Sequence, residues 1–414
     1  MAASDPHRTV EAVWRMESAR LIAGLARIVG DVGLAEEIAQ DALVAALERW
    51  PESGVPRNPG AWLMATGKHR AIDLLRRRQR LDRKLAELAH GLDADRAGAE
   101  EPSEPDDIGD DLLRLVFTAC HPVLSSDARV ALALRVLGGL TTKEIARAFL
   151  VRESTIAQRI VRAKRALADA GVPFEVPEGP ERPERLSSVL EVIYLVFNEG
   201  YSATAGDDLM RPALCEEALR LGRVLAELMP AEPEVHGLVA LMEIQASRSR
   251  ARTGPAGEPV LLMDQDRARW DQLLIRRGLA ALERAEALGV LGPYGIQASI
   301  AACHARATTP EETDWARIAE LYGILAAVSP SPVVELNRAV AVSMASGPAA
   351  GLELVDALGA EPALRRYHLL PSVRGDLLVR LERFDEARAE FERAAELTGN
   401  ERERAILLGR AAEC

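Results

Sequence analysis

The 414-residue chain has few aromatic residues and few of the patterns that mark strands or membrane spans. Aromatic residues make up 4% of the sequence, and runs of Val, Ile, Thr or Tyr are scarce, which disfavours β-structure. No window reaches about 18 consecutive apolar residues, and the N-terminus has early acids but no apolar core, so neither a membrane span nor a signal peptide is expected. Abundant Ala, Leu and Arg predict an all-α protein, and we expect it in the cytoplasm.

Cysteine is also scarce, and no CxxC pair occurs, which excludes a disulfide framework and a cysteine zinc site. The four cysteines are Cys120, Cys215, Cys303 and Cys414. Two of them precede a histidine directly, but neighbouring side chains on a helix point about 100° apart, so packing is the favoured role. Two acidic clusters could bind a cation, although solvated or capping roles are favoured; they comprise Glu199 with Asp207 and Asp208, and Asp264 with Asp266 and Asp271.

The sequence lacks the common catalytic and phosphate-binding motifs. It contains no GxGxxG, P-loop, HExxH or GxSxG pattern. We therefore predict that the protein is not an enzyme, and we expect no metal and no cofactor.

Negative charge is unevenly distributed along the chain. Residues 1–171 contain 25 basic and 25 acidic residues, so the formal net charge of −12 lies entirely in residues 172–414. The segment 91–111 has nine acids and one Arg, which leaves 24 bases against 16 acids in the two segments that flank it. These basic flanks suit contact with nucleic acid.

Two segments interrupt the helical pattern and predict domain boundaries. Residues 91–111 are acidic and poor in apolar side chains, as in a flexible linker, and residues 172–186 are rich in proline. We expect helical domains at 1–90 and 112–171, followed by a helical extension at 187–414.

The extension contains a pattern that resembles tetratricopeptide repeats. Small residues stand where two helices would meet, and a bulky one stands between them; the positions are Gly375, Leu378, Ala387, Phe391 and Ala394. A degenerate earlier unit starts 37 residues before Ala387 and comprises Ala350, Leu354, Ala357 and Pro362. A solenoid-like, TPR-like extension is therefore plausible.

The segment 140–167 predicts two short helices joined by a tight turn. Thr141 and Glu144 form a T-x-x-E capping box, so the first helix should begin at Thr142. Its buried face would include Ile145, Ala146 and Phe149, and a second apolar stripe comprises Ile156, Ile160, Ala163 and Leu167. This arrangement predicts a helix-turn-helix.

The second helix of this pair carries a polar, basic face. Ser154, Gln158, Arg162 and Arg165 point away from the apolar stripe, with Thr155 at its shoulder. Arg and Gln suit base edges, whereas Arg152, Arg159 and Lys164 could meet phosphates. The alternative is an ordinary amphipathic hairpin in an Arg-rich protein.

The same segment resembles the domain of the sigma-70 family that reads the promoter −35 element. The match to "TxxEIA...TIxxRxxRAKxxL" comprises Leu140, Thr142, Glu144, Ile145, Ala146, Thr155, Ile156, Arg159, Arg162, Ala163 and Leu167. The turn departs from the common form, because Leu150 and Ser154 stand at places where Gly often occurs. Either Leu150 adopts a left-handed conformation at a cost of roughly 1 kcal/mol, or the turn has another shape. Arg152 also stands where a capping Ser or Thr is usual.

A second resemblance to sigma factors lies in the N-terminal domain. Residues 31–50 resemble the helix that docks on the clamp of RNA polymerase, and the matching positions are Glu37, Ile38, Gln40 and Asp41. Carboxylates there could pair with Arg and Lys of a partner, whereas the alternative is a solvated helix face.

Residues 58–84 resemble the part of sigma factors that melts and reads the −10 element, and the matching positions are Trp62, Leu63, Ala71, Ile72, Asp73, Leu74, Leu75, Arg76 and Arg77. The resemblance, together with a run of bases, implies DNA contacts by Trp62, Lys68, His69, Arg70, Asp73, Arg76, Arg77 and Arg80. Basic side chains can hold the backbones of separating strands, and a pocket must offset the cost of extruding a base. Lys68 and His69 replace the usual Arg and Asn, and Trp62 is favoured as a core residue rather than a stacking platform.

Two such domains in this order resemble the extracytoplasmic function sigma factors, in the group with a C-terminal tetratricopeptide-like extension. The resemblance implies a factor that binds core RNA polymerase through the β′ clamp and the β flap and directs initiation at promoter DNA, without a membrane partner. We expect the extension to modulate this activity, in response to a regulator that the sequence does not identify. The alternatives are a free-standing helix-turn-helix regulator and a TPR-like interaction scaffold.

Overall fold

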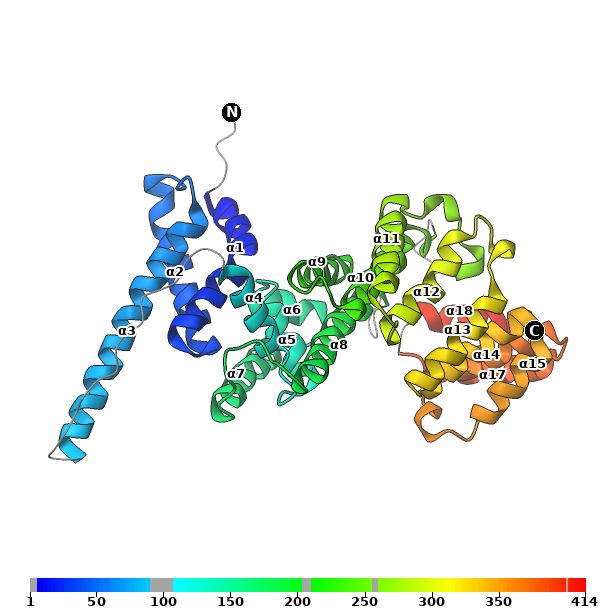
Figure 1. Ribbon diagram of the computed structural model, residues 1–414. Helices are drawn as coiled ribbons and strands as arrows, with labels where there is room; N and C mark the ends of the chain where they lie inside the picture. The colour runs from blue at the N-terminus through cyan, green and yellow to red at the C-terminus, as the bar shows by residue number, and fades with distance from the viewer. Residues whose placement is uncertain (1–5, 90–106, 203–209, 255–259, 400) are drawn as a thin grey trace. The chain divides into compact units, whose positions relative to one another are not determined.

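The computed structural model describes residues 6–89, 107–202, 210–254, 260–399 and 401–414. The chain divides into two compact units, Met1–Ile193 and Tyr194–Cys414. The described residues form α-helices and short 3-10 helices, with no β-strand among them, so the predicted all-α class is confirmed (Figure 1). No helix among them is long and apolar enough to cross a membrane.

The first unit contains two groups of helices and the first half of α8. Its helices are α1 (Pro6–Val29), α2 (Val32–Ser53), α3 (Pro59–Ala89), α4 (Asp107–Ala119), α5 (Ser126–Val136), α6 (Thr142–Ala148), α7 (Glu153–Asp169) and α8 (Glu181–Tyr201). Helices α1, α2 and α3 pack on one another, while α5 packs on α4, α6 and α7. Gly67 of α3 permits a close approach to α1, because a Cβ at Gly67 would lie 3.0 Å from the side chain of Leu25.

A helix begins inside each of the two predicted linkers, residues 91–111 and 172–186. The acidic segment falls largely on residues 90–106, which lie outside the described residues, but α4 already begins at Asp107. Asp111 is 3% exposed and pairs with Arg27 of α1, so this acid has a structural role. Helix α8 begins at Glu181, inside the proline-rich segment, because Pro183 lies in the first helical turn, where an amide is not needed.

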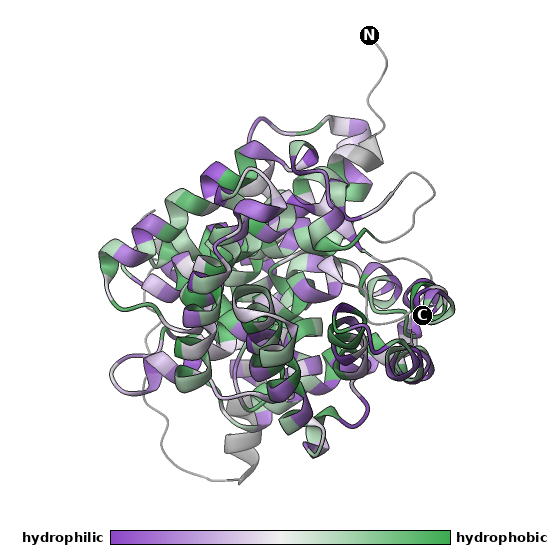
Figure 2. Cartoon of the chain, turned by 90° about the vertical axis from the view of Figure 1, so that its right-hand side faces the viewer, coloured by the Kyte–Doolittle hydropathy of each residue, from purple (hydrophilic) through white to green (hydrophobic). Residues whose placement is uncertain are grey.

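In the second unit, most helices pack on the helix that follows in the chain. They are α9 (Pro212–Leu228), α10 (Pro233–Ser247), α11 (Gln272–Leu288), α12 (Pro293–Arg306), α13 (Trp315–Val328), α14 (Pro332–Ser346), α15 (Pro348–Leu358), α16 (Leu369–Arg380), α17 (Phe384–Leu397) and α18 (Glu401–Glu413). Short 3-10 helices are η1 (Ser249–Ala251), η2 (Leu262–Asp264), η3 (Arg267–Arg269), η4 (Pro310–Glu312) and η5 (Pro362–Leu364). Hydrophobic and hydrophilic residues alternate on single helices (Figure 2), as expected when each helix buries one face against its neighbours.

Helices α16 and α17 pack as the repeat pattern predicted. Gly375 faces Phe391, since a Cβ on this glycine would lie 2.7 Å from the aromatic ring. Leu378, Ala387 and Ala394 are fully buried. The predicted small-residue contact between the two helices is therefore confirmed, while the relation to tetratricopeptide repeats stays a prediction.

The positions predicted for the earlier, degenerate repeat, which begins at Ala350, were wrong by one residue. Ala357 is exposed and Ala350 is only half-buried, whereas Gly351, 36 residues before Ala387, is buried. A Cβ on Gly351 would lie 2.9 Å from the carbonyl oxygen of Ala339 on α14. The two helices thus approach each other at the glycine.

Candidate nucleic-acid interface

The first helix of the predicted helix-turn-helix begins as expected. The Glu144 amide donates to the Thr141 hydroxyl at 3.1 Å, and the Thr141 amide donates to the Glu144 carboxylate at 2.8 Å. Both halves of the capping box are therefore present, and α6 starts at Thr142. Ile145 and Ala146 are buried, while Phe149 is half-buried.

The turn after α6 is a left-handed helix cap without glycine. Leu150 has a φ of 51° and is 56% exposed. The Val151 amide donates to the Ala146 carbonyl at 3.0 Å and the Leu150 amide to the Arg147 carbonyl at 3.4 Å, which is the Schellman pattern. The left-handed alternative for Leu150 is thus confirmed. Arg152 is the N-cap of α7, and its side chain forms no capping hydrogen bond.

Helix α7 buries one stripe and presents the opposite face to solvent. Ile156, Ile160, Ala163 and Leu167 are each at most 6% exposed, as predicted. The exposed predicted DNA contacts are Arg152, Ser154, Gln158, Arg162 and Arg165, and Thr155 is half-buried. The structure therefore brings five polar side chains to one accessible region around α7.

Three of the basic side chains predicted to contact the −35 element have acidic partners. Arg159 pairs with Asp127 of α5 at 2.8 Å, and Arg165 pairs with Asp169 at 3.4 Å on the surface of α7. Exposed pairs of this kind contribute only about 0–1 kcal/mol, so DNA can compete for these arginines. Lys164 differs, because its side chain is only 17% exposed and pairs with Glu36 of α2.

The predicted polymerase-binding residues of α2 lie partly on its surface and partly in the core. Glu37 and Asp41 are exposed, and they lie one helical turn apart. Ile38 is 1% exposed and packs inside the first unit. Gln40 is half-buried and donates to Glu36, while Asp41 pairs with Arg70 of α3 at 3.3 Å.

Glu36 is an important residue that the sequence analysis missed. Its carboxylate is 3% exposed and accepts from Arg135 of α5 at 2.8 Å as well as from Lys164 of α7. A buried carboxylate with two cationic partners joins α2 to the helix-turn-helix group. Glu36 lies four residues after Val32 and three before Ala39, both of which are buried, so helical periodicity did place it on the inner face.

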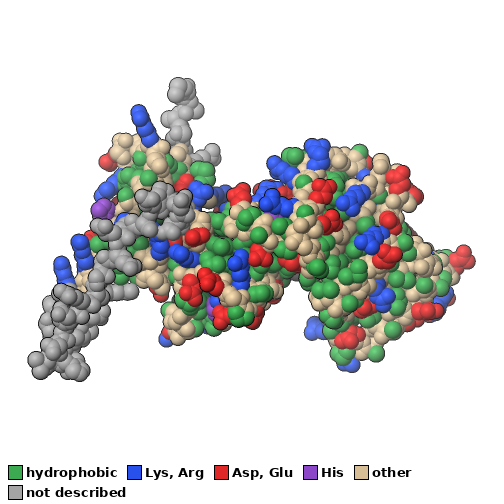
Figure 3. All heavy atoms as spheres, viewed as in Figure 1, with side chains coloured by type: hydrophobic (Ala, Val, Ile, Leu, Met, Phe, Trp, Pro, Cys, Tyr) green, Lys and Arg blue, Asp and Glu red, His purple; other side chains and the backbone are tan. Residues whose placement is uncertain are grey.

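Helix α3 carries the predicted strand-opening residues. Trp62 is half-buried and meets the buried Trp50 edge to face at 5.4 Å between ring centroids. The exposed residues of the set are His69, Asp73, Arg76, Arg77 and Arg80, whereas Lys68 and Arg70 are half-buried. Basic side chains stand out on the part of α3 that Figure 3 draws in colour, which gives this part of the helix a cationic edge.

Two of the cysteines are buried, and two of the clustered acids cap helices. Burial raises the pKa of Cys120 to about 12 and that of Cys215 to about 12, so both thiols stay protonated at neutral pH. Asp266 and Asp271 cap η3 and α11, which confirms the capping role for these two acids. Asp207 and Asp208 lie outside the described residues, and no group of metal-ligating residues occurs among the described ones.

Three families match successive parts of the chain. Residues 14–81 match Sigma-70 region 2, and residues 114–167 match Sigma-70 region 4. Residues 185–286 match a family of unknown function, DUF6596. The two sigma matches cover the α1–α3 group and the group that contains α6 and α7.

Relatives agree with these matches. An uncharacterized protein of Rhizobium meliloti is 47% identical over 395 residues, which cover 92% of this chain and 90% of that protein. The ECF RNA polymerase sigma factor SigL of Mycobacterium tuberculosis is 28% identical over 143 residues, or 34% of this chain and 76% of SigL. The probable ECF RNA polymerase sigma factor SigI of that organism is 27% identical over 177 residues, or 42% and 60%. The chain therefore belongs to the sigma-70 family, as an RNA polymerase sigma factor of the ECF group with a C-terminal DUF6596 region.

Proposed function

We propose that the chain joins core RNA polymerase and directs initiation at promoters, with α7 reading the −35 element and α3 opening and reading the −10 element. The observation that carries this proposal is the exposed polar face of α7, which lies opposite a fully buried stripe. Gln158 and Arg162 have the donors and acceptors that base edges in the major groove require. Sigma factors are not enzymes, and we propose no catalytic site.

We assign polymerase binding to the exposed side of α2. The carboxylates of Glu37 and Asp41 can pair with Lys and Arg of the β′ clamp. We assign binding of the β flap to the helix-turn-helix group. Ile38 supports this surface from inside, since its side chain is buried.

We assign contacts with the −10 region to α3. Arg76, Arg77 and Arg80 are exposed and can bind phosphates of the separating strands. Exposed His69 and Asp73 lie one turn apart on the same helix, where polar groups can meet an extruded base. Trp62 supports the start of α3 through its contact with Trp50.

The free chain holds Lys164 in an intramolecular ion pair. The Lys164 side chain is only 17% exposed while it pairs with Glu36, so little of it is accessible to a DNA phosphate. Glu36 precedes Glu37 on the proposed polymerase-binding helix. We infer that engagement of α2 by core polymerase releases Lys164 for DNA.

We further propose that the C-terminal extension modulates the sigma domains. The first half of α8 is fastened to the region 4 helices: Arg129 pairs with Glu191 at 3.0 Å, and Arg185 donates to the Phe117 carbonyl at 3.1 Å. A helix held in this way can transmit a change in the extension, such as the binding of a regulator. A chain that ends after Ile193 should differ from the full chain in transcription, and equal promoter binding and transcription would remove this proposal.

Binding to purified core polymerase, followed by sedimentation, tests the proposed function. The full chain should bind core polymerase, and Glu37→Lys with Asp41→Lys should weaken binding by about 10-fold or more through charge reversal. Glu11→Lys, on the exposed side of α1, is the matched control. A free-standing regulator would bind DNA but not core polymerase, and an interaction scaffold would bind neither.

A further inference from the structure

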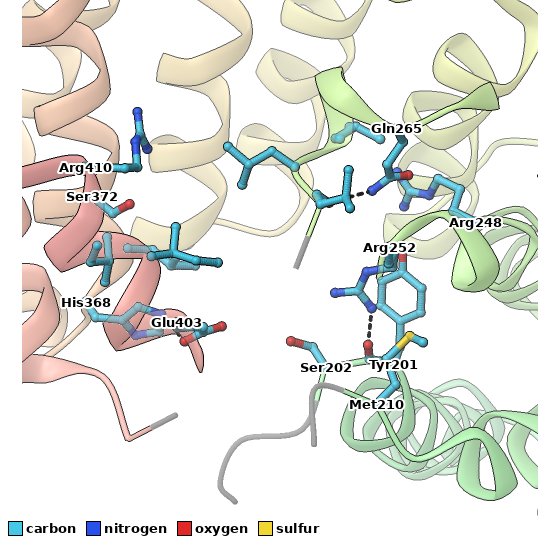
Figure 4. A pocket seen from close by; sticks show the side chains of 16 residues that line it. Tyr201, Ser202, Met210, Arg248, Arg252, Gln265, His368, Ser372, Glu403 and Arg410 are labelled. Carbon is cyan, nitrogen blue, oxygen red and sulfur yellow. Dashed lines mark hydrogen bonds and ion pairs between the residues drawn. The ribbon is translucent and has the colours of Figure 1, made fainter. Parts of the chain in front are cut away.

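The second unit contains a cavity of about 350 Å³, within the range of small-molecule sites (Figure 4). One wall comes from the end of α8, η1 and the residues near η2, and the other comes from α16 and α18. Segments more than 100 residues apart in the sequence thus form one site.

Two arginines of the first wall are oriented by aromatic rings. The Arg252 guanidinium lies 3.8 Å from the centroid of the Tyr201 ring and donates to the Tyr201 carbonyl. The Arg248 guanidinium lies 5.9 Å from the Tyr201 ring and 5.9 Å from the Trp270 ring. Cation–π contacts hold a guanidinium in place but leave its charge without a counter-ion.

Arg248 has no acidic partner among the residues that the structure describes. Among the described residues, no ion pair is formed by its side chain, and its buried Nε has no acceptor. Burial lowers the pKa of Arg252 and the nearby Arg248 adds to the effect, while Tyr201 and the Glu403 carboxylate of the opposite wall oppose it. Cations in such surroundings favour an anion, because a donor removed from water without an acceptor loses hydrogen bonds that an anionic oxygen restores.

Gln265 provides an unused acceptor on the same wall. The residue is 7% exposed, and its Nε2 donates to the Val260 carbonyl at 3.1 Å. Since a carbonyl only accepts, this bond fixes Oε1 as the other end of the amide. Oε1 is buried and has no donor among the described residues. The wall therefore offers a hydrogen-bond acceptor next to two cations.

The opposite wall adds apolar surface, and its acid is already engaged. Glu403 lies 3.3 Å from His368 and accepts from Thr398 at 2.8 Å. Arg410 is paired with Asp376. Leu369, Ile406 and Leu407 face the cavity, as does Leu261 of the first wall, so the site is cationic at one end and apolar along its length.

We propose that this cavity binds a small organic anion with an apolar body, whose acidic group pairs with Arg248 and Arg252 and whose apolar part lies against Leu261, Leu369, Ile406 and Leu407. A hydroxyl or amide donor on the ligand would satisfy Gln265. This proposal concerns binding alone and does not rest on the proposed function in transcription.

Fluorescence titration of the full chain with 1-anilinonaphthalene-8-sulfonate tests the proposal, because this probe is an organic anion with an apolar body. Binding should saturate at one site, and decanoate should displace the probe while decanol, its uncharged counterpart, should not. Arg248→Gln should weaken binding by about 10-fold or more. Arg250→Gln is the matched control, since Arg250 is exposed on η1 and does not line the cavity.

A second variant keeps the charges but fills the space. Ile406→Trp should abolish displaceable binding, and circular dichroism and the melting temperature check that each variant is folded. The proposal is overturned if the folded wild-type chain has no saturable site, if Arg248→Gln binds as tightly as Arg250→Gln, or if decanol competes as well as decanoate. Should one variant not fold, the other variant and the decanol comparison decide the question.

Discussion

Leu150 carries the strain of the turn between α6 and α7. A left-handed backbone places the Cβ of a non-glycine residue too close to the following carbonyl, at a cost of about 1–2 kcal/mol. The sequence could flag this position because the family pattern often has Gly there. It could not decide whether the turn kept its shape, since that depends on the two hydrogen bonds that close it.

Replacing Leu150 by glycine should stabilise the helix-turn-helix. Relief of strain exceeds the extra entropy of an unfolded glycine, which leaves a net gain of roughly 0.5–1 kcal/mol. Hydrogen exchange of the α7 amides should slow by a corresponding factor. Leu150→Ala retains a Cβ and should show no such gain; equal slowing in both variants would disprove the strain.

His304 should make the second unit sensitive to acid. Burial lowers its pKa from 6.5 to about 4, and Arg248 and Arg267 add to the effect. The unfolded chain binds a proton on this residue below pH 6.5, whereas the folded chain resists protonation until about pH 4. Stability is therefore full above pH 6.5 and falls by about 3 kcal/mol as the pH drops towards 4.

Urea unfolding at several pH values checks this expectation. His304→Gln should flatten the loss of stability between pH 6.5 and 4, because the substituted side chain does not titrate. His69→Gln, exposed on α3, should follow the wild type. A His304→Gln curve parallel to the wild-type curve would exclude this residue as the cause.

For the helices, the local sequence pattern predicted where a helix begins and which of its faces is buried. The capping box, the apolar stripe of α7 and the contact between Gly375 and Phe391 all depend on residues close in sequence or on repeated spacing. Pairs between distant elements, such as Glu36 with Arg135 and Lys164, could not be predicted, because no local pattern specifies which charges meet. The cavity between α16, α18 and η1 was missed for the same reason.

Glu36→Gln should weaken the packing of α2 on the helix-turn-helix group. The substitution leaves two largely buried cations without their carboxylate, at the lower end of the roughly 3–5 kcal/mol typical of broken buried pairs. Chemical acetylation of Lys164, followed by mass spectrometry, should become faster. Glu37→Gln is the control because that carboxylate is exposed; equal acetylation rates in the two variants would contradict the proposed contact.

Gln158→Ala should relax base preference at the −35 element. Loss of a base-edge contact costs about 1–3 kcal/mol on the preferred sequence and less elsewhere. Selection of bound promoters from a library randomised at −35 measures the preference directly. Equal losses on preferred and random DNA would reassign Gln158 to a phosphate contact.

In the whole molecule, the distribution of charge distinguishes the sigma domains from the C-terminal extension. The net charge of residues 1–171 is zero and that of residues 172–414 is −12, so the sigma domains keep the cations that DNA requires. The order of the two sigma regions could be predicted from their sequence motifs. The start of helix α8 could not, because the prolines of residues 172–186 suggested a linker, whereas α8 begins at Glu181 and the residues after Pro183 pack on the region 4 helices.

We propose that this chain reads promoters as a subunit of RNA polymerase. Run-off transcription with core polymerase, on templates randomised at the −35 and −10 positions, tests it most directly. The full chain should yield transcripts from a defined subset of templates, Arg162→Ala should lower the yield from them by about 10-fold or more, and Arg388→Ala, exposed on α17, should match the wild type. No promoter-dependent transcript from any template would contradict the claim.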